Sequence, residues 1–161
     1  MRVFIPSLVI VVIDQLSKLW IKNNFTLFES RNIIGEFLRF SYVENPGIAF
    51  GIRLGNLREV VTIISIVIVL YLIFLLYSSK QFVYVERLSL SFILGGAIGN
   101  LIDRILIYVP NSTYTGVIDF IDIGINTHRW YIFNIADSAV TVGITLYLIY
   151  STFFENKQII K

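Results

Sequence analysis

The stretch VVTIISIVIVLYLIFLLYSS, residues 60–79, contains no Asp, Glu, Lys, Arg or His. A helix that crosses the hydrocarbon core of a bilayer needs about 20 predominantly apolar residues, and this stretch supplies them. We therefore predict a membrane-spanning helix at about 58–79. Three further segments are long and apolar enough to do the same, at about 3–21, 86–107 and 131–154. The sequence thus predicts a mainly α-helical membrane protein with four transmembrane helices.

The composition of the whole chain agrees with this fold class. Of its 161 residues, 56% are hydrophobic and only 15% are charged, whereas a soluble domain has roughly a quarter charged residues. The chain has no cysteine, which excludes disulfides and thiolate metal sites, and its single histidine, His128, cannot form a histidine-based metal site alone. A net charge of +2 without a polybasic run gives no indication of nucleic-acid binding.

Polar connections separate the apolar segments. In the first connection, residues 22–57, the stretch EFLRFSYVEN alternates apolar and polar residues as a half-buried strand does, and NPGIAFG contains turn signals. We predict a small β-sheet on the membrane surface here, at about 36–44. The third connection, 108–130, contains the loop PNSTYTG and a compact apolar stretch, VIDFIDIGI, with two carboxylates. We expect residues 1–161 to form one membrane-embedded domain.

Four carboxylates are expected in one leaflet of the membrane. With four spans, the first and third connections lie on the same side. Asp14 and Asp103 lie within the first and third spans, near the ends that exit to that side. Asp137 lies near the entry of the last span, and Asp119 lies in the third connection. A charge at the bilayer centre costs at least about 2.5–3.5 kcal/mol on insertion scales, so membrane carboxylates usually have a function.

Structural explanations exist for some of these charges. Asp14 and Lys18 are four residues apart on one helix face and can form an ion pair, and a retained helix fits them better than a cleaved signal peptide. Asp103 is adjacent to Arg104, which favours a structural ion pair there. Gly95 and Gly99 form a small-xxx-small pattern that favours close helix packing.

Asp119 and Asp137 are the strongest candidates for chemistry, because neither has a basic residue within four positions. Two neighbouring carboxylates share one proton, so one can act as general base on water while the other polarises a carbonyl. Asp122 stands in a setting similar to that of Asp119, and sequence spacing alone barely distinguishes the two.

Membrane carboxylates also mark ion- or proton-coupled transporters, although four spans without internal repeats are few for such a carrier. A non-catalytic scaffold subunit is a third possibility.

Five sequence blocks resemble the family of bacterial lipoprotein signal peptidases, also called signal peptidase II, which are integral membrane aspartic endopeptidases. In family order, the blocks are DQLSK at 14–18, NPGIAFG at 45–51, GGAIGNLIDR at 95–104, VIDFI at 117–121 and FNIADS at 133–138.

The resemblance implies that Asp119 and Asp137 form a catalytic dyad that needs no metal or cofactor. It assigns supporting or substrate-binding positions to Asp14, Lys18, Asn45, Gly47, Asn100, Asp103, Arg104, Asn134 and Ala136. It further implies cytoplasmic termini and a site near the outer face of the inner membrane, with the sheet extracytoplasmic. The charges of the connections do not fix this orientation by themselves.

The implied partners are membrane lipids, globomycin-type inhibitors and the substrates. The substrates are prolipoproteins whose lipobox cysteine bears a diacylglyceryl group, and the implied cleavage falls just before that cysteine. The surface sheet could hold such a substrate extended through main-chain hydrogen bonds.

Overall fold

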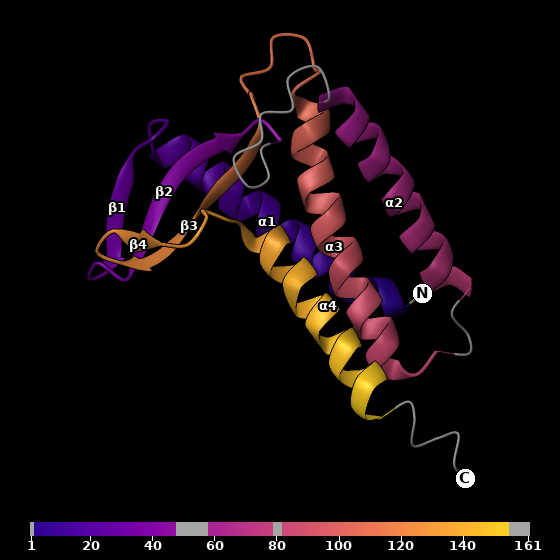
Figure 1. The fold of residues 1–161 in the computed structure, drawn as a ribbon. Coiled ribbons are helices and arrows are strands. Elements are labelled where there is room, and N and C mark those ends of the chain that lie inside the picture. Colours follow the sequence, from indigo (N-terminus) through magenta and orange to yellow (C-terminus); the bar gives the residue numbers. More distant parts are fainter. Residues whose placement is uncertain (1, 48–57, 79–81, 155–161) are drawn as a thin grey trace.

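The computed structural model describes residues 2–47, 58–78 and 82–154. Within these residues, four helices are long and apolar enough to cross a membrane, as the sequence predicts. They are α1 (Ile5–Asn24), α2 (Arg58–Ser78), α3 (Tyr84–Leu106) and α4 (Ile135–Phe153), and a short 3-10 helix, Arg2–Phe4, precedes α1. Figure 1 shows that α1 and α3 begin, and α2 and α4 end, at one end of the bundle, while the sheet lies beyond the opposite end of α1.

The predicted surface sheet is confirmed, and it is larger than expected. Its strands are β1 (Ser30–Ile34), β2 (Leu38–Asn45), β3 (Val117–Ile125) and β4 (His128–Arg129), antiparallel in the order β1-β2-β3-β4. The first two come from the connection in which a sheet was predicted, and the other two from the connection after α3. Residues 117–120 are all buried, so β3 lacks the alternation of polar and apolar residues that marks a half-buried strand.

The last helix begins at Ile135, four residues later than the sequence indicates. Residues before it stay extended because they pair with β3: Phe133 donates its N–H to the Ile121 carbonyl and accepts from the Ile121 N–H. Asn134 then caps the helix by accepting a hydrogen bond from the Asp137 N–H. Asp137 is therefore the third residue of α4.

The central helix α3 packs against each of the other three helices. The small residues on α3 make this possible. A Cβ on Gly95 would lie 2.9 Å from Ile10 Cβ on α1, and a Cβ on Gly96 would overlap the Ala136 carbonyl oxygen on α4. The predicted role of Gly95 and Gly99 in close packing is thus confirmed. Gly96, in addition, allows α4 to approach α3 closely.

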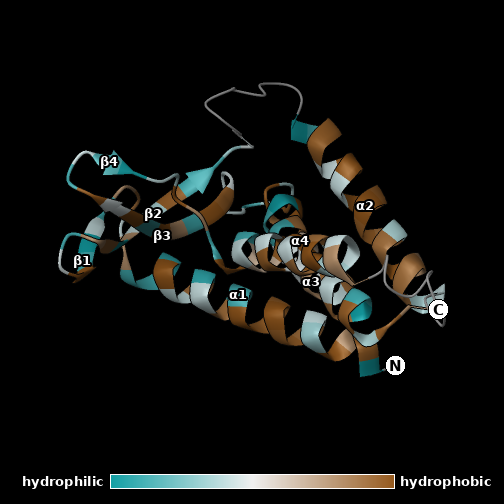
Figure 2. Ribbon diagram, turned by 60° about the horizontal axis from the view of Figure 1, so that its bottom comes forward, coloured by the Kyte–Doolittle hydropathy of each residue, from teal (hydrophilic) through white to brown (hydrophobic). Residues whose placement is uncertain are grey.

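Two apolar clusters complete the core. One joins α2 to α3, with Leu72 and Leu76 against Leu90 and Leu94. The other joins the end of α1 to the sheet, through the cluster Ile21, Phe25, Tyr42, Ile118 and Phe120. Much of the remaining apolar surface of the helices is exposed and faces outward, as expected for contact with lipid (Figure 2).

We expect the exchange Gly96→Ala to destabilise the fold by about 1–3 kcal/mol, because the added methyl group cannot enter the α3–α4 contact without moving the backbone. Thermal unfolding in detergent micelles measures this loss. The matched control is Val142→Ile, which also adds one methyl group but at an exposed position of α4. Equal melting temperatures for the two variants would contradict the close packing at Gly96.

Candidate active site

A buried cation joins two carboxylates at the centre of the site. Lys18 Nζ lies 2.9 Å from Asp14 Oδ2 and 2.9 Å from Asp103 Oδ2, and all three side chains are at most 1% exposed. Lys18 also donates to Asn100 Oδ1 at 3.0 Å. The predicted pair of Asp14 with Lys18 is confirmed, but the sequence assigned Asp103 to the wrong base: Lys18 from α1, and not the adjacent Arg104, is its ion-pair partner.

The two carboxylates of this cluster also hold neighbouring elements. Asp14 Oδ1 accepts the N–H of Ala136 at the start of α4, at 2.9 Å. Asp103 Oδ2 accepts the N–H of Ile118 on β3, at 3.1 Å. Gln15, which sequence reasoning did not single out, places its Nε2 between the two carboxylates, 3.1 Å from Asp14 Oδ2 and 3.2 Å from Asp103 Oδ1. The cluster therefore fixes α1, α3, β3 and α4 relative to one another.

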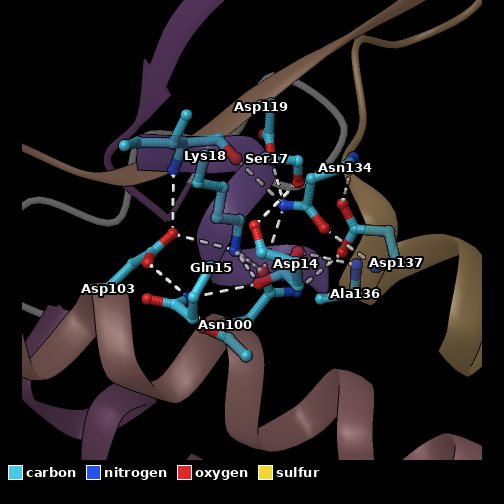
Figure 3. A network of polar contacts seen from close by, with 12 residues as sticks. Asp14, Gln15, Ser17, Lys18, Asn100, Asp103, Asp119, Asn134, Ala136 and Asp137 are labelled. Carbon is cyan, nitrogen blue, oxygen red and sulfur yellow. Dashed lines mark hydrogen bonds and ion pairs between the residues drawn. The ribbon is translucent and has the colours of Figure 1, made fainter. Parts of the chain in front are cut away.

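Asn134 lies between the two predicted catalytic carboxylates (Figure 3). Its Nδ2 donates to Asp119 Oδ1 at 2.6 Å and also lies 3.1 Å from Asn100 Oδ1. Its backbone N–H donates to Asp137 Oδ2 at 3.1 Å, while its Oδ1 accepts the Asp137 N–H at 2.9 Å. The structure thus brings Asp119 and Asp137 to opposite sides of one fully buried asparagine.

Asp137 has an environment suited to a negative charge. Besides the Asn134 N–H, Asn100 Nδ2 donates to its Oδ1 at 2.8 Å. Its place in the first turn of α4 adds the positive end of the helix dipole. The carboxylate therefore lies at a helix N-terminus rather than within an apolar run, which accounts for its presence in this segment.

Asp119 is held in a more apolar setting. It lies on β3, is 4% exposed, and accepts hydrogen bonds from Asn134 and from Asn45 Nδ2, the latter at 3.2 Å. Burial and, next, the nearby charge of Asp137 raise the pKa of Asp119 to about 7, although the hydrogen bonds from Asn45 and Asn134 and the charge of Lys18 act to lower it. The site therefore contains one carboxyl group that gains or loses its proton near neutral pH.

Asp122 is distinguished from Asp119 by its partners. Arg129 Nε donates to Asp122 Oδ1 at 2.6 Å, and Ser41 donates to its Oδ2 at 3.1 Å. Arg129 also donates to the carbonyl of Glu36. Asp122 is thus part of an ion pair that fastens the sheet together, which the sequence spacing could not show.

A cleft opens beside Asn45, between β2, α2 and α3. It is shallow, with a cavity volume of about 10 Å³, and its lining includes Gly47, Arg58, Arg104 and Tyr108. The charge of Arg104 interacts with the carboxylates of the site. Gly47 has φ +95°, a conformation that favours glycine, and its N–H donates to Asn45 Oδ1 at 3.1 Å. The remainder of the NPGIAFG block, residues 48–51, lies outside the described residues.

A further ion pair, not predicted from the sequence, holds Glu44, the residue before Asn45. Glu44 Oε1 lies 2.5 Å from Lys22 Nζ, and Glu44 Oε2 accepts hydrogen bonds from the N–H and Oγ1 of Thr115. Gly116 follows and lies so close to the Asn45 backbone that a Cβ there would overlap it. These contacts fix the end of β2, and with it the amide that reaches Asp119.

Comparison with known proteins identifies the family. A family model described as signal peptidase (SPase) II matches residues 7–154. The chain belongs to the signal peptidase II family. Lipoprotein signal peptidase of Moorella thermoacetica is 40% identical over 143 residues, which cover 87% of this chain and 85% of that protein. The corresponding protein of Lactobacillus johnsonii is 38% identical over 155 residues, which cover 96% and 94% of the two chains.

Solved structures agree with the family assignment. One bacterial membrane enzyme structure is 31% identical in sequence and superposes with a TM-score of 0.80, covering 95% of this chain and 94% of its own. A second has 29% identity and a TM-score of 0.79, covering 96% and 92% of the two chains. Together with the four spanning helices, these similarities confirm the resemblance and identify a multi-pass bacterial membrane protein of a peptidase family.

Replacing Lys18 by Met leaves Asp14 and Asp103 buried without their cation, so we expect a loss of about 3–5 kcal/mol in the free energy of unfolding. Thermal unfolding in detergent measures it. The matched control is Arg31→Met, which removes an exposed ion pair with Glu29 and is expected to cost about 1 kcal/mol or less. A Lys18→Met variant as stable as this control would show that the buried cluster does not hold the helices together.

Proposed function

We propose that this protein is an aspartic endopeptidase that removes signal peptides from prolipoproteins, with Asp119 and Asp137 as its catalytic dyad. The observation that carries the proposal is the contact of Asn134 with both carboxylates, since it holds two acids at one site at the edge of the helix bundle. Membership of the signal peptidase II family supports the reaction class. The same membership argues against the transporter and scaffold alternatives.

The two carboxylates differ in the way the reaction requires. Asp137 accepts two N–H groups at a helix N-terminus and so serves as the ionised general base. Asp119, whose pKa is raised to about 7, carries the proton that the pair shares near neutral pH. In the proposed reaction, Asp119 therefore begins the cycle protonated, and Asp137 begins it ionised.

The reaction follows from these roles. A water molecule within reach of both carboxylates loses a proton to Asp137 as its oxygen attacks the carbonyl carbon of the scissile peptide bond. Asp119 donates its proton to the carbonyl oxygen, which stabilises the tetrahedral intermediate. When the carbon–nitrogen bond breaks, the proton held by Asp137 passes to the leaving amine, and the carbonyl re-forms as Asp119 recovers its proton.

The substrate proposed is a prolipoprotein whose lipobox cysteine bears a diacylglyceryl group, cleaved just before that cysteine. The cleft beside Asn45 and Gly47 lies between two spanning helices and the sheet, so a peptide could bind there while its lipid stays in the bilayer. Arg104 and Arg58 line this cleft and would face the polar part of the substrate. A globomycin-type inhibitor would occupy the same cleft.

The proposed orientation has cytoplasmic termini and the dyad near the outer face of the membrane. The first and third connections, which contribute the sheet, lie at the end of the bundle opposite the start of α1 (Figure 1). The whole chain, 1–161, then acts as one peptidase domain. Its supporting residues are those of the buried cluster and of the asparagine contacts: Asp14, Lys18, Asn45, Gly47, Asn100, Asp103, Arg104, Asn134 and Ala136.

Replacing either member of the dyad, by Asp119→Asn or Asp137→Asn, should lower kcat by at least about 1,000-fold, because an amide cannot take a proton from water or give one to the carbonyl. The measurement is cleavage of a diacylglyceryl-modified prolipoprotein by purified protein, with thermal unfolding as a check of folding. Asp122→Asn is the matched control and should retain activity. An inactive Asp122→Asn protein that remains folded would show that the dyad is assigned wrongly.

Cleavage by the unmodified protein is also expected to continue in the presence of a metal chelator.

The pH dependence of cleavage tests the role of Asp119. Because its pKa is about 7, kcat/KM should fall as the pH rises above about 7 and the dyad loses its shared proton. The exchange Asn45→Ala removes a hydrogen bond that lowers this pKa, so the alkaline limb should move to higher pH. Asp122→Asn should leave the limb in place. An alkaline limb that is the same in Asn45→Ala and in the unmodified protein would contradict the assignment.

A further inference from the structure

A cavity lies at the end of the bundle opposite the sheet, between the starts of α1 and α3. Its volume is about 400 Å³. Two arginines line it, Arg2 from the short helix before α1 and Arg87 from the first turns of α3. No carboxylate is found among the described residues that line it. The cavity thus carries two positive charges and takes no part in the active site.

Apart from the Tyr84 side chain, the rest of the cavity wall is apolar. Val3 and Pro6 come from the N-terminal segment, Phe82 from the residues just before α3, and Leu88 from the first turns of α3. Next to Pro6, the side chains of Ile5 and Leu8 are 56% and 64% exposed on the outer surface of a helix that spans the membrane. The apolar wall therefore continues into the lipid-facing surface of α1. A site with cationic groups above an apolar wall matches a molecule with a charged head and a hydrocarbon tail.

Glu86, the sequence neighbour of Arg87, caps the start of its own helix. Glu86 Oε2 accepts the backbone N–H of Val83 at 2.9 Å, which caps the start of α3. A guanidinium has several N–H donors in a planar fork and can bind phosphate oxygens while keeping a contact to the protein. Arg2 and Arg87 are thus chemically suited to bind one phosphate together.

We propose that this cavity binds the headgroup phosphate of an anionic phospholipid from the leaflet at this end of the bundle. Basic pockets between transmembrane helices bind such headgroups through the same two features, cationic side chains and an adjoining apolar wall. A soluble phosphate would satisfy the arginines but would leave the apolar wall uncovered. The proposal does not depend on the proposed peptidase activity, because none of these residues belongs to the dyad or its supporting cluster.

Bound lipid would strengthen the contact between α1 and α3. These helices already meet near the cavity, where Ser91 Oγ donates to the Val3 carbonyl at 2.7 Å and Ser7 Oγ donates to the Ser91 carbonyl at 2.8 Å. A ligand that binds the folded state alone stabilises it. Anionic lipid should therefore raise the melting temperature of the protein.

The test is a titration of the full chain in detergent micelles with phosphatidylglycerol or phosphatidylcholine, with bound lipid counted by native mass spectrometry. We expect tighter binding of phosphatidylglycerol, and a loss of about tenfold in its affinity in the double variant Arg2→Gln, Arg87→Gln. Phosphatidylcholine carries its phosphate beside a cationic choline, so its weaker binding should fall less in this variant. The matched control is Arg31→Gln, since Arg31 lies on the sheet at the other end of the molecule.

Equal binding of the two lipids, or an unchanged lipid preference in the double variant, would overturn the proposal. A third titration uses sn-glycerol 3-phosphate, and displacement of phosphatidylglycerol at equal concentration would indicate a soluble-phosphate site instead. Melting temperatures without lipid show whether the double variant is folded. If it is not, Arg2→Gln alone must still lower the affinity for phosphatidylglycerol, because Arg2 is an exposed residue whose loss does not disturb the core.

Discussion

The arrangement of this molecule depends on one buried ammonium group. Lys18 and its two carboxylate partners are almost completely removed from solvent, and such burial is costly unless every charge is paired and hydrogen-bonded. The remaining acceptor positions are used for structure: Asp14 holds the start of α4 through Ala136, and Asp103 holds β3 through Ile118. The two elements that carry the catalytic candidates are therefore positioned by the same ion cluster. This cluster explains why a chain with so few charged residues places several of them inside the bundle.

Hydrophobic patterning was sufficient to predict the helices and the class of the fold. An uninterrupted apolar segment such as 60–79 has few alternatives, and topology then required Asp14, Asp103, Asp119 and Asp137 to lie on one side. The strand β3 escaped prediction because both of its faces are covered at residues 117–120, which removes the alternating pattern. The start of α4 was placed too early because apolar residues before Asn134 pair with β3 instead of entering the helix.

Within the site, sequence reasoning identified the residues better than it identified their pairing. Adjacency suggested Arg104 as the partner of Asp103, but successive residues on a helix point in different directions, and the partner comes from another helix. Gln15 and Glu44 were overlooked because their roles exist only after distant segments meet. The difference between Asp119 and Asp122 likewise arises from Arg129, whose approach depends on the turn between β3 and β4.

The position of Asn134 between Asp119 and Asp137 has a consequence for the proposed reaction. The Asn134 side chain does not titrate, and its amide N–H can donate to a carboxyl oxygen whether or not that group bears a proton. Its Oδ1 accepts the Asp137 N–H and its backbone carbonyl accepts the Ser138 hydroxyl, and neither contact involves a carboxyl group. In the proposed reaction, protons can therefore move among the acids while the amide that lies between Asp119 and Asp137 keeps the same hydrogen-bonding groups.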